Sequence, residues 1–166
     1  MNYKSLFIPN FLIFLTIVTQ NRANILLDNL DILNHALFNT IKLYKFHLIA
    51  YTVQSNHIHC ILKPKSISDY SNIIKSFKYS FTKQYKQKYP LTKKLWQNRF
   101  WEHTIRNNDD LNKHLDYIHY NSIKHENISP KDWKYSSFKK FVKSGLYEND
   151  WCNFEDKYRI KLLNYE

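Results

Sequence analysis

A His-hydrophobe-His pattern, His57-Ile58-His59, is the first group of residues whose types and spacing suit chemistry. In a β-strand, residues two apart share a face, so both imidazoles would point the same way and Ile58 would point toward a core. Two neighbouring imidazoles can bind one divalent cation. The same pattern is met by an exposed or hydrogen-bonded histidine pair, so both interpretations stay open on this evidence.

A tyrosine and an asparagine four residues apart, Tyr117 and Asn121, form the second group. On a helix, this spacing places both side chains on one face. A tyrosine can act as a covalent nucleophile, but a phenol has an ordinary pKa of about 10 and needs help at neutral pH. The amide oxygen of Asn121 would suit a hard ion such as Mg²⁺ or Mn²⁺, and a metal can polarise a phosphate. Because the chain has 13 tyrosines, a structural role for Tyr117 is the competing interpretation.

The third group combines an aromatic and polar segment, residues 95–106, with two lysines of an upstream helical segment. Rings interleaved with cationic and amide side chains can stack bases and hold phosphates, and a lysine face can follow a DNA backbone. Burial of the rings and a solvated lysine face are the alternatives. Glu102 and His103 are further candidates for metal binding or proton transfer. The candidate DNA contacts are Trp96, Gln97, Arg99, Trp101, His103, Arg106, Lys75 and Lys78.

The composition favours a nucleic-acid partner. The 166 residues include 25 Lys+Arg and 14 Asp+Glu, a net charge of +11, and 17% are aromatic. Positive charge with many aromatic rings suits single-stranded nucleic acid, although an acidic membrane is the other polyanion. The only glycine is Gly145, which argues against phosphate-binding Gly-rich loops. The two cysteines argue against a disulfide framework and favour a cytoplasmic location.

The elements that must position these residues follow from the pattern of apolar side chains. The apolar residues 6–18 are too short to span a bilayer and lack a cleavage site, so we expect a buried strand rather than a signal peptide, and no membrane partner. Asp28 is a candidate cap for the first helix. The sequence predicts strands at 10–20, 46–53, 57–63 and within 99–106, and helices at about 28–44, 68–88 and 109–125.

This order of elements predicts an α+β fold. The first six elements, β-α-β-β-α-β, match the ferredoxin-like arrangement, an antiparallel sheet with helices on one face. The last helix would carry Tyr117 and would be capped by Asn107 or Asn108. A basic, aromatic segment follows Pro130, and either packing or DNA binding would explain its composition. That fold hosts many functions, so the residues of the site must carry the functional argument.

Three segments in this order, NHIHCIL, LWQNRFWEHTIRN and LDYIHYNSIKH, resemble the REP-associated tyrosine transposases. These belong to the HUH single-tyrosine transposases, which are named for a His-hydrophobe-His motif. The resemblance runs from about Phe11 to Trp151. It implies a ferredoxin-like transposase domain, residues 1–128, and a C-terminal extension, residues 129–166, packed on or continuous with it.

The resemblance also implies the reaction and its residues. Tyr117 would attack a phosphodiester of single-stranded DNA and form a 5′-phosphotyrosine, which a 3′-hydroxyl later attacks to rejoin the strand. His57, His59 and Asn121 would bind Mg²⁺ or Mn²⁺, and no nucleotide cofactor would be needed. The partner would be single-stranded DNA with imperfect hairpins, bound by a monomer or a homodimer. A domesticated hairpin-binding protein without strand transfer is the alternative, and a replication initiator or relaxase would ordinarily sit in a longer chain.

Three positions depart from the family pattern. Asn-Pro-Val commonly follows the nucleophile, where this chain has Asn121-Ser122-Ile123. Ser55 replaces a proline before the histidine motif, and Glu126 replaces a glycine after the Lys-His pair. These changes spare the candidate ligands and nucleophile and concern the geometry of the last helix.

Overall fold

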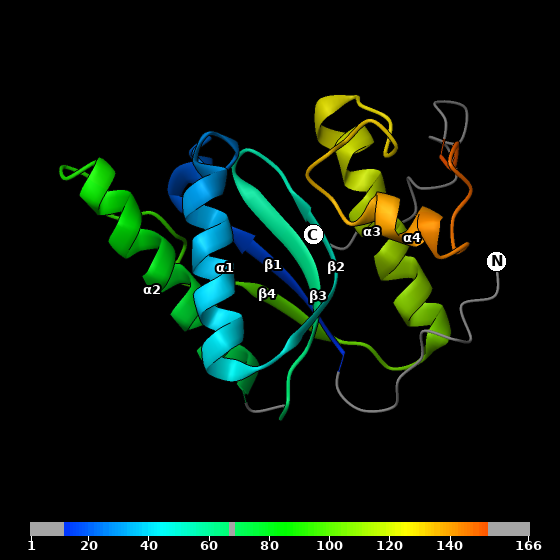
Figure 1. The fold of residues 1–166 in the computed structure, drawn as a ribbon, viewed down its shortest axis with the longest axis horizontal. Coiled ribbons are helices and arrows are strands. Elements are labelled where there is room, and N and C mark those ends of the chain that lie inside the picture. Colours follow the sequence, from blue (N-terminus) through cyan, green and yellow to red (C-terminus); the bar gives the residue numbers. More distant parts are fainter. Residues whose placement is uncertain (1–11, 67–68, 153–166) are drawn as a thin grey trace.

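The computed structural model describes residues 12–66 and 69–152, which alternate strands and helices in the order β-α-β-β-α-β and continue into further helices (Figure 1). The predicted fold class, α+β with a ferredoxin-like core, is confirmed. The elements are β1 (Ile13–Val18), η1 (Gln20–Arg22), η2 (Leu27–Asn29), α1 (Leu30–Tyr44), β2 (His47–Val53), β3 (His57–Lys63), α2 (Tyr70–Lys88), β4 (Trp101–Thr104), α3 (Asn108–Glu126) and α4 (Phe138–Lys143).

The four strands form one antiparallel sheet in the order β2-β3-β1-β4. The central strand β1 pairs with two neighbours, so Thr16 lies opposite His59 on β3 and opposite Trp101 on β4. Two residues before Thr16, Phe14 lies opposite Ile61 on β3 and opposite His103 on β4. Because side chains alternate across a strand, these two rows lie on the same face of the sheet.

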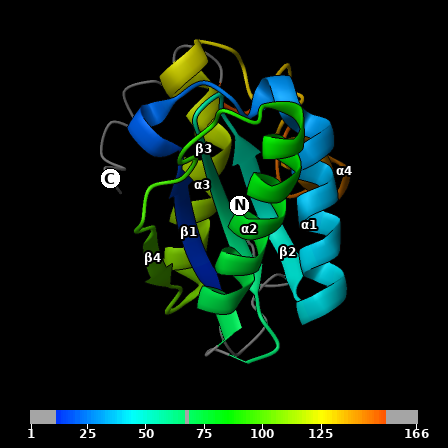
Figure 2. The same ribbon diagram turned by 90° about the vertical axis from the view of Figure 1, so that its left-hand side faces the viewer.

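Both faces of the sheet are covered. Helices α1 and α2 lie on one face and α3 on the opposite face, as the two views show (Figure 2). Each face has its own apolar core. Residues Ile13, Leu15 and Ile17 of β1 belong to the core beneath α1 and α2. Phe14 belongs to the second core, with Leu111, Leu115 and Ile118 of α3. The two central helices of the ferredoxin-like unit therefore share one face, and α3 adds a layer to the other.

Among the described α-helices, only α3 begins with a side-chain cap. Asn107 caps α3, because its side-chain oxygen accepts a hydrogen bond from the Asp110 backbone at 2.9 Å. The prediction that Asp28 caps α1 was wrong: Asp28 lies in the preceding 3-10 turn, and Asn29 occupies the N-cap position. Asn29 donates its side-chain amide to the Ile25 carbonyl instead, at 2.8 Å.

The predicted boundaries of the strands and of α2 are close to those observed. Strand β3 spans the predicted residues 57–63, and β2 begins one residue later than predicted. Strand β1 covers the middle of the predicted range 10–20, whose first two residues lie outside the described part of the chain. Helix α2 begins at Tyr70, whereas Ser68 lies outside the described residues.

The apolar stretch near the N-terminus forms a buried strand where it is described. Residues 13–17 of β1 are buried in the sheet, and residues 6–11 lie outside the described part of the chain. Among the described helices, none combines the length and the apolar character that crossing a membrane requires.

Residues 129–152 pack against β2 and α3. Tyr135 accepts a hydrogen bond from Val53 at 2.9 Å, and Ser136 forms a bridge with Thr52, which covers the outer edge of β2. Phe138 and Phe141 of α4 are buried in the second core. The packing interpretation therefore accounts for this segment as far as residue 152. Its division from the first domain at residue 128 stays a prediction.

Candidate active site

His57 and His59 lie side by side on β3, on the face that α3 covers. Both side chains are buried, and their ring centroids lie 4.8 Å apart. Ile58, which lies between the two histidines, and Cys60, which follows them, belong to the core on the other face of the sheet. The predicted shared face of the two imidazoles is confirmed, because β3 is a regular strand through this motif.

Helix α3 brings Tyr117 and Asn121 onto the same two histidines. The ring of Tyr117 lies 5.0 Å from that of His59, centroid to centroid. The Asn121 side-chain oxygen lies 3.2 Å from Nε2 of His57. Tyr117 and Asn121 are both buried, at 1% and 0% exposure. Phe14 of β1 contacts the rings of His59 and Tyr117 at 5.8 and 5.9 Å and so forms the floor of the site.

The outer nitrogens of both imidazoles are held by neighbouring oxygens. Nδ1 of His59 lies 2.8 Å from the Thr16 hydroxyl, and Nδ1 of His57 lies 2.7 Å from the Asn56 side-chain oxygen. The Asn56 amide nitrogen donates to Asn24, which directs its oxygen toward His57. With the proton on Nδ1, each neutral ring presents the lone pair of Nε2 toward α3. Such outer hydrogen bonds are the usual support of metal-binding histidines.

The inner atoms of this group fit a divalent cation. Nε2 of His57 lies 3.2 Å from the side-chain oxygen of Asn121, close enough for both atoms to bind one cation. Nε2 of His59 and the amide nitrogen of Asn121 are buried without a hydrogen-bond partner. Two imidazole nitrogens and one amide oxygen are a donor set that first-row divalent metals accept.

The surroundings of the site favour a neutral His59 and an anionic substrate. Burial holds the pKa of His59 well below its usual value, and the nearby His57, His125, Lys124 and Arg22 lower it further. His59 is therefore neutral at neutral pH, the form that binds metals. The Lys124 ammonium lies 5.5 Å from the centre of the Tyr117 ring, and the His125 ring lies 4.7 Å from that of His57.

A second polar cluster, His103, Asp110 and His114, lies toward the start of α3. Its candidate ligand atoms all lie within 4.8 Å of one another, a spacing compatible with a metal ion. Asp110 accepts hydrogen bonds from His103 at 2.8 Å and from the backbone and side chain of Arg106 at 3.0 and 3.3 Å. Burial alone would raise the pKa of Asp110, but these hydrogen bonds lower it below its usual value.

Sequence reasoning singled out His103 but missed its two partners. The available signal was the spacing of Asp110 and His114, four residues apart on one helix face. Nδ1 of His114 lies 3.2 Å from the Asp110 carboxylate and 2.8 Å from its carbonyl oxygen. Their meeting with His103 depends on the packing of α3 against β4, which local spacing does not reveal.

The candidate DNA contacts fall on different sides of the molecule. Trp101 and His103 share the sheet face of His59, and the Arg106 side chain is 74% exposed. Trp96 is buried in the first core, where its ring meets Phe81. Lys78 donates to the Gln97 carbonyl at 2.9 Å. Lys75 and Arg99 are exposed, but α2, which carries Lys75 and Lys78, lies across the sheet from α3 (Figure 2).

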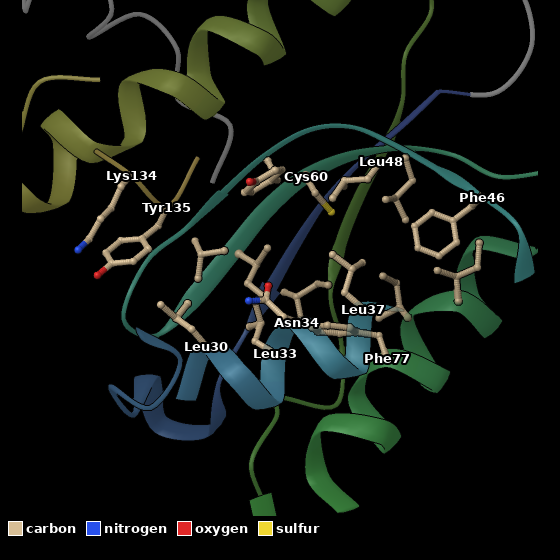
Figure 3. Close-up of a pocket in the computed structure, with 17 residues that line it drawn as sticks. Leu30, Leu33, Asn34, Leu37, Phe46, Leu48, Cys60, Phe77, Lys134 and Tyr135 are labelled. Atoms are coloured by element: carbon tan, nitrogen blue, oxygen red, sulfur yellow. The ribbon is translucent and has the colours of Figure 1, made fainter. Parts of the chain in front are cut away.

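An apolar cavity of about 290 Å³ lies between the sheet and α1, and its lining does not include the residues of the histidine site (Figure 3). Leu33, Leu37 and Phe77 are among the side chains that line it. The Cys60 thiol also lines the cavity, and burial raises its pKa to about 12, so the thiol stays protonated. The cavity therefore offers apolar surface and no activated nucleophile.

Comparison with known proteins identifies the family. Residues 9–121 match the family model described as "Transposase IS200 like". The chain is 34% identical to the REP-associated tyrosine transposase of Escherichia coli K12, covering 90% of each protein. It is 38% identical to a Haemophilus influenzae protein assigned to the same group, covering 90% of this chain and 92% of that protein.

The chain belongs to the REP-associated tyrosine transposases. A solved structure of a REP-associated tyrosine transposase bound to a REP hairpin matches this fold with a TM-score of 0.78 and 33% identity, over 92% of each chain. The fold and the family predicted from the sequence are thereby confirmed. The roles of the individual site residues stay predictions.

The structure shows how this REP-associated tyrosine transposase accommodates Ser122, where the family commonly has proline. Helix α3 continues through Ser122 as far as Glu126. It ends at Asn127, whose φ of 56° closes the helix, with its N–H donating to the Ile123 carbonyl at 3.2 Å. Ser122 is buried, and its carbonyl accepts from Ile128 at 3.2 Å. Helical geometry is therefore intact on both sides of Asn121.

Proposed function

We propose that this protein cleaves and rejoins single-stranded DNA at hairpin-bearing sequences through a covalent 5′-phosphotyrosine on Tyr117. The observation that carries the proposal is the meeting of α3 with β3, which buries Tyr117 and Asn121 against His57 and His59. Membership of the transposase family supports a DNA-cleaving enzyme, and the REP hairpin in the matching structure supports the class of substrate.

In the cleavage step, the Tyr117 oxygen attacks a backbone phosphorus and gives up its proton. A P–O3′ bond breaks, the released 3′-oxygen takes up a proton, and the phosphate stays on the tyrosine. In the joining step, a 3′-hydroxyl attacks the phosphotyrosine, and the phenol leaves and is protonated again. No nucleotide cofactor is required, because the protein–DNA bond conserves the energy of the phosphodiester.

His57, His59 and Asn121 are the residues that would hold a divalent metal, Mg²⁺ or Mn²⁺. When bound, such an ion compensates the charge that develops on the phosphate oxygens. Thr16 and Asn56 orient the two imidazoles for this task through their hydrogen bonds to Nδ1. Phe14 holds the Tyr117 ring against β3, and Lys124 places a positive charge beside it.

The competing proposal is a hairpin-binding protein without strand transfer. It does not account for Nε2 of His59 and the amide nitrogen of Asn121, because burying polar atoms without a hydrogen-bond partner destabilises the fold. Binding to a hairpin would need only exposed basic and aromatic side chains. The two proposals differ in one observable, the covalent adduct.

The deciding experiment uses the purified chain and a labelled oligonucleotide with an imperfect hairpin and single-stranded flanks. With Mg²⁺ or Mn²⁺, we expect a protein–DNA adduct that survives denaturing electrophoresis. Tyr117→Phe should bind the same oligonucleotide and form no adduct. An adduct formed equally well by Tyr117→Phe would overturn the nucleophile, and an absence of adduct in the parent protein would favour the binding-only proposal.

The metal assignment has its own test. His57→Ala and His59→Ala should each lower the affinity for Mn²⁺, measured by calorimetry without DNA. Tyr117→Phe is the matched control, because it removes only the hydroxyl. Unchanged Mn²⁺ affinity in both histidine variants would contradict the assignment.

A further inference from the structure

A row of three residues crosses the sheet from the histidine site to its edge. His59 of β3 pairs with Thr16 of β1, and Thr16 pairs with Trp101 of β4. All three side chains face α3, because paired residues share a face. Neighbouring strands lie about 4.8 Å apart, so Trp101 is roughly 10 Å across the sheet from His59. The indole is therefore near the site of cleavage, on the same surface.

Trp101 is partly exposed, and its indole packs against the rings of His103 and Phe14. The residue is 41% exposed on β4. Its indole is nearly parallel to the His103 imidazole, with planes at 10° and centroids 5.9 Å apart. The indole and the Phe14 ring make a T-shaped contact, with centroids 5.5 Å apart. The same Phe14 contacts Tyr117 at 5.9 Å. Shared packing thus fixes the indole relative to the candidate nucleophile.

The His103, Asp110 and His114 cluster explains why this support is rigid. His103 stacks on His114, with ring centroids 4.7 Å apart and planes at 16°, so two imidazole rings lie in sequence behind the Trp101 indole. Asp110 holds His103 by a 2.8 Å hydrogen bond and is itself fixed by Arg106. The proposed cleavage chemistry assigns no role to His103, Asp110 or His114. Holding the Trp101 indole in place is a role that fits their contacts.

We propose that Trp101 stacks on an unpaired nucleobase next to the phosphodiester that Tyr117 attacks, and that His103, Asp110 and His114 position the indole. The inference rests on the proposed function and names a binding subsite within it. A flat, exposed, supported indole suits any base, because every base has a π-face. The exposed Arg106 guanidinium beside the cluster supplies a cation for the backbone of the same strand.

The first test measures binding in the Tyr117→Phe background, where no adduct forms. Removing a base-stacking ring weakens binding about 5- to 150-fold, so Trp101→Ala should lose affinity in this range for a hairpin with single-stranded flanks. Trp101→Phe should retain most of the affinity, and Trp101→Leu should not. A blunt hairpin without flanks should bind all four proteins alike. Circular dichroism checks that each variant is folded.

Two results of that test would overturn the proposal that Trp101 stacks on an unpaired base. One is unchanged affinity of Trp101→Ala for the flanked hairpin. The other is an equal loss for flanked and blunt hairpins, because an unpaired base would then play no part. Failure of the proposed function gives a different result. If the parent protein forms no adduct, but Trp101→Ala still weakens binding of the flanked hairpin, strand transfer is refuted and base stacking by Trp101 is retained.

A second test locates the base. An abasic site is moved through the flank one nucleotide at a time, and the affinity of the parent is compared with that of Trp101→Ala. At one position beside the cleavage site, the abasic substitution should weaken the parent and leave Trp101→Ala unaffected. The absence of any such coupled position would contradict direct stacking.

The positioning role of the cluster is tested with Asp110→Asn. In this variant, an abasic site at the coupled position should lower the affinity less than it does in the parent. Binding of the blunt hairpin should stay unchanged. A merely structural defect would instead weaken both substrates. A loss of one bound Mn²⁺ in Asp110→Asn would show that the cluster is a metal site and would overturn the positioning role.

Discussion

Asp116, the neighbour of Tyr117 on α3, couples the stability of this fold to pH. Burial raises the pKa of its carboxyl to about 6, although the Tyr147 hydroxyl, which donates to it at 2.8 Å, acts in the opposite direction. The folded state therefore binds the proton more tightly than the unfolded chain does. Its contribution to stability is fully present below about pH 4 and is lost as the pH rises through about 6.

The size of this effect follows from the two pKa values. An aspartate carboxyl has an ordinary pKa of 3.8, and the pKa in the folded protein is about 6. At 1.36 kcal/mol per unit, the ionised carboxylate costs the fold about 3 kcal/mol at neutral pH, as an upper bound. Because the side chain is only partly buried, we expect about 1–3 kcal/mol.

The perturbation is Asp116→Asn, which removes the ionisable group and keeps an oxygen that accepts from Tyr147. Urea unfolding followed by circular dichroism, at pH values between 4 and 8, measures the free energy of unfolding. The variant should be about 1–3 kcal/mol more stable than the parent at pH 7. This advantage should shrink steadily toward pH 4.

Tyr147→Phe is the matched control, because it removes the hydroxyl that favours the ionised carboxylate. It should therefore destabilise the protein more at pH 7 than at pH 4, the reverse of the pattern for Asp116→Asn. A stability difference between Asp116→Asn and the parent that is the same at every pH would refute the reasoning, since the carboxyl would then not titrate differently in the two states.

Three further predictions concern the surroundings of the site. Thr16→Val removes the hydroxyl that orients His59 and should lower Mn²⁺ affinity about 10- to 100-fold in calorimetry, whereas Thr16→Ser should not; equal affinity in both would argue against this support. Phe14→Ala, at a fully buried position, should lower the free energy of unfolding by about 3–5 kcal/mol, and a loss below about 1 kcal/mol would contradict the packing of the site floor. The Cys60 thiol, whose pKa burial raises to about 12, should stay unmodified by a thiol reagent in the native protein and react fully in urea; rapid native labelling of Cys60 would show that the apolar cavity opens.

The sequence by itself determined the order of the strands and helices. Strand β3 and the shared face of His57 and His59 follow from the alternation of side chains, a property of neighbouring residues. The start of α3 follows from Asn107, whose side chain caps the nearby backbone. These features depend on contacts within a few residues, so their signals are local.

The tertiary structure alone decided which face of the sheet each helix covers. Ile13, Leu15 and Ile17 supply one apolar face of β1, while Phe14 supplies the other, together with Leu12 just before the strand. Because both faces are apolar, alternation could not reveal where α3 would pack. Burial of Trp96, the support behind Trp101 and the covering of β2 by residues 135–137 depend in the same way on long-range contacts. Only that packing brings Tyr117 to His59, because the two residues are far apart in the chain and the free energy that joins them comes from burying α3 against the sheet.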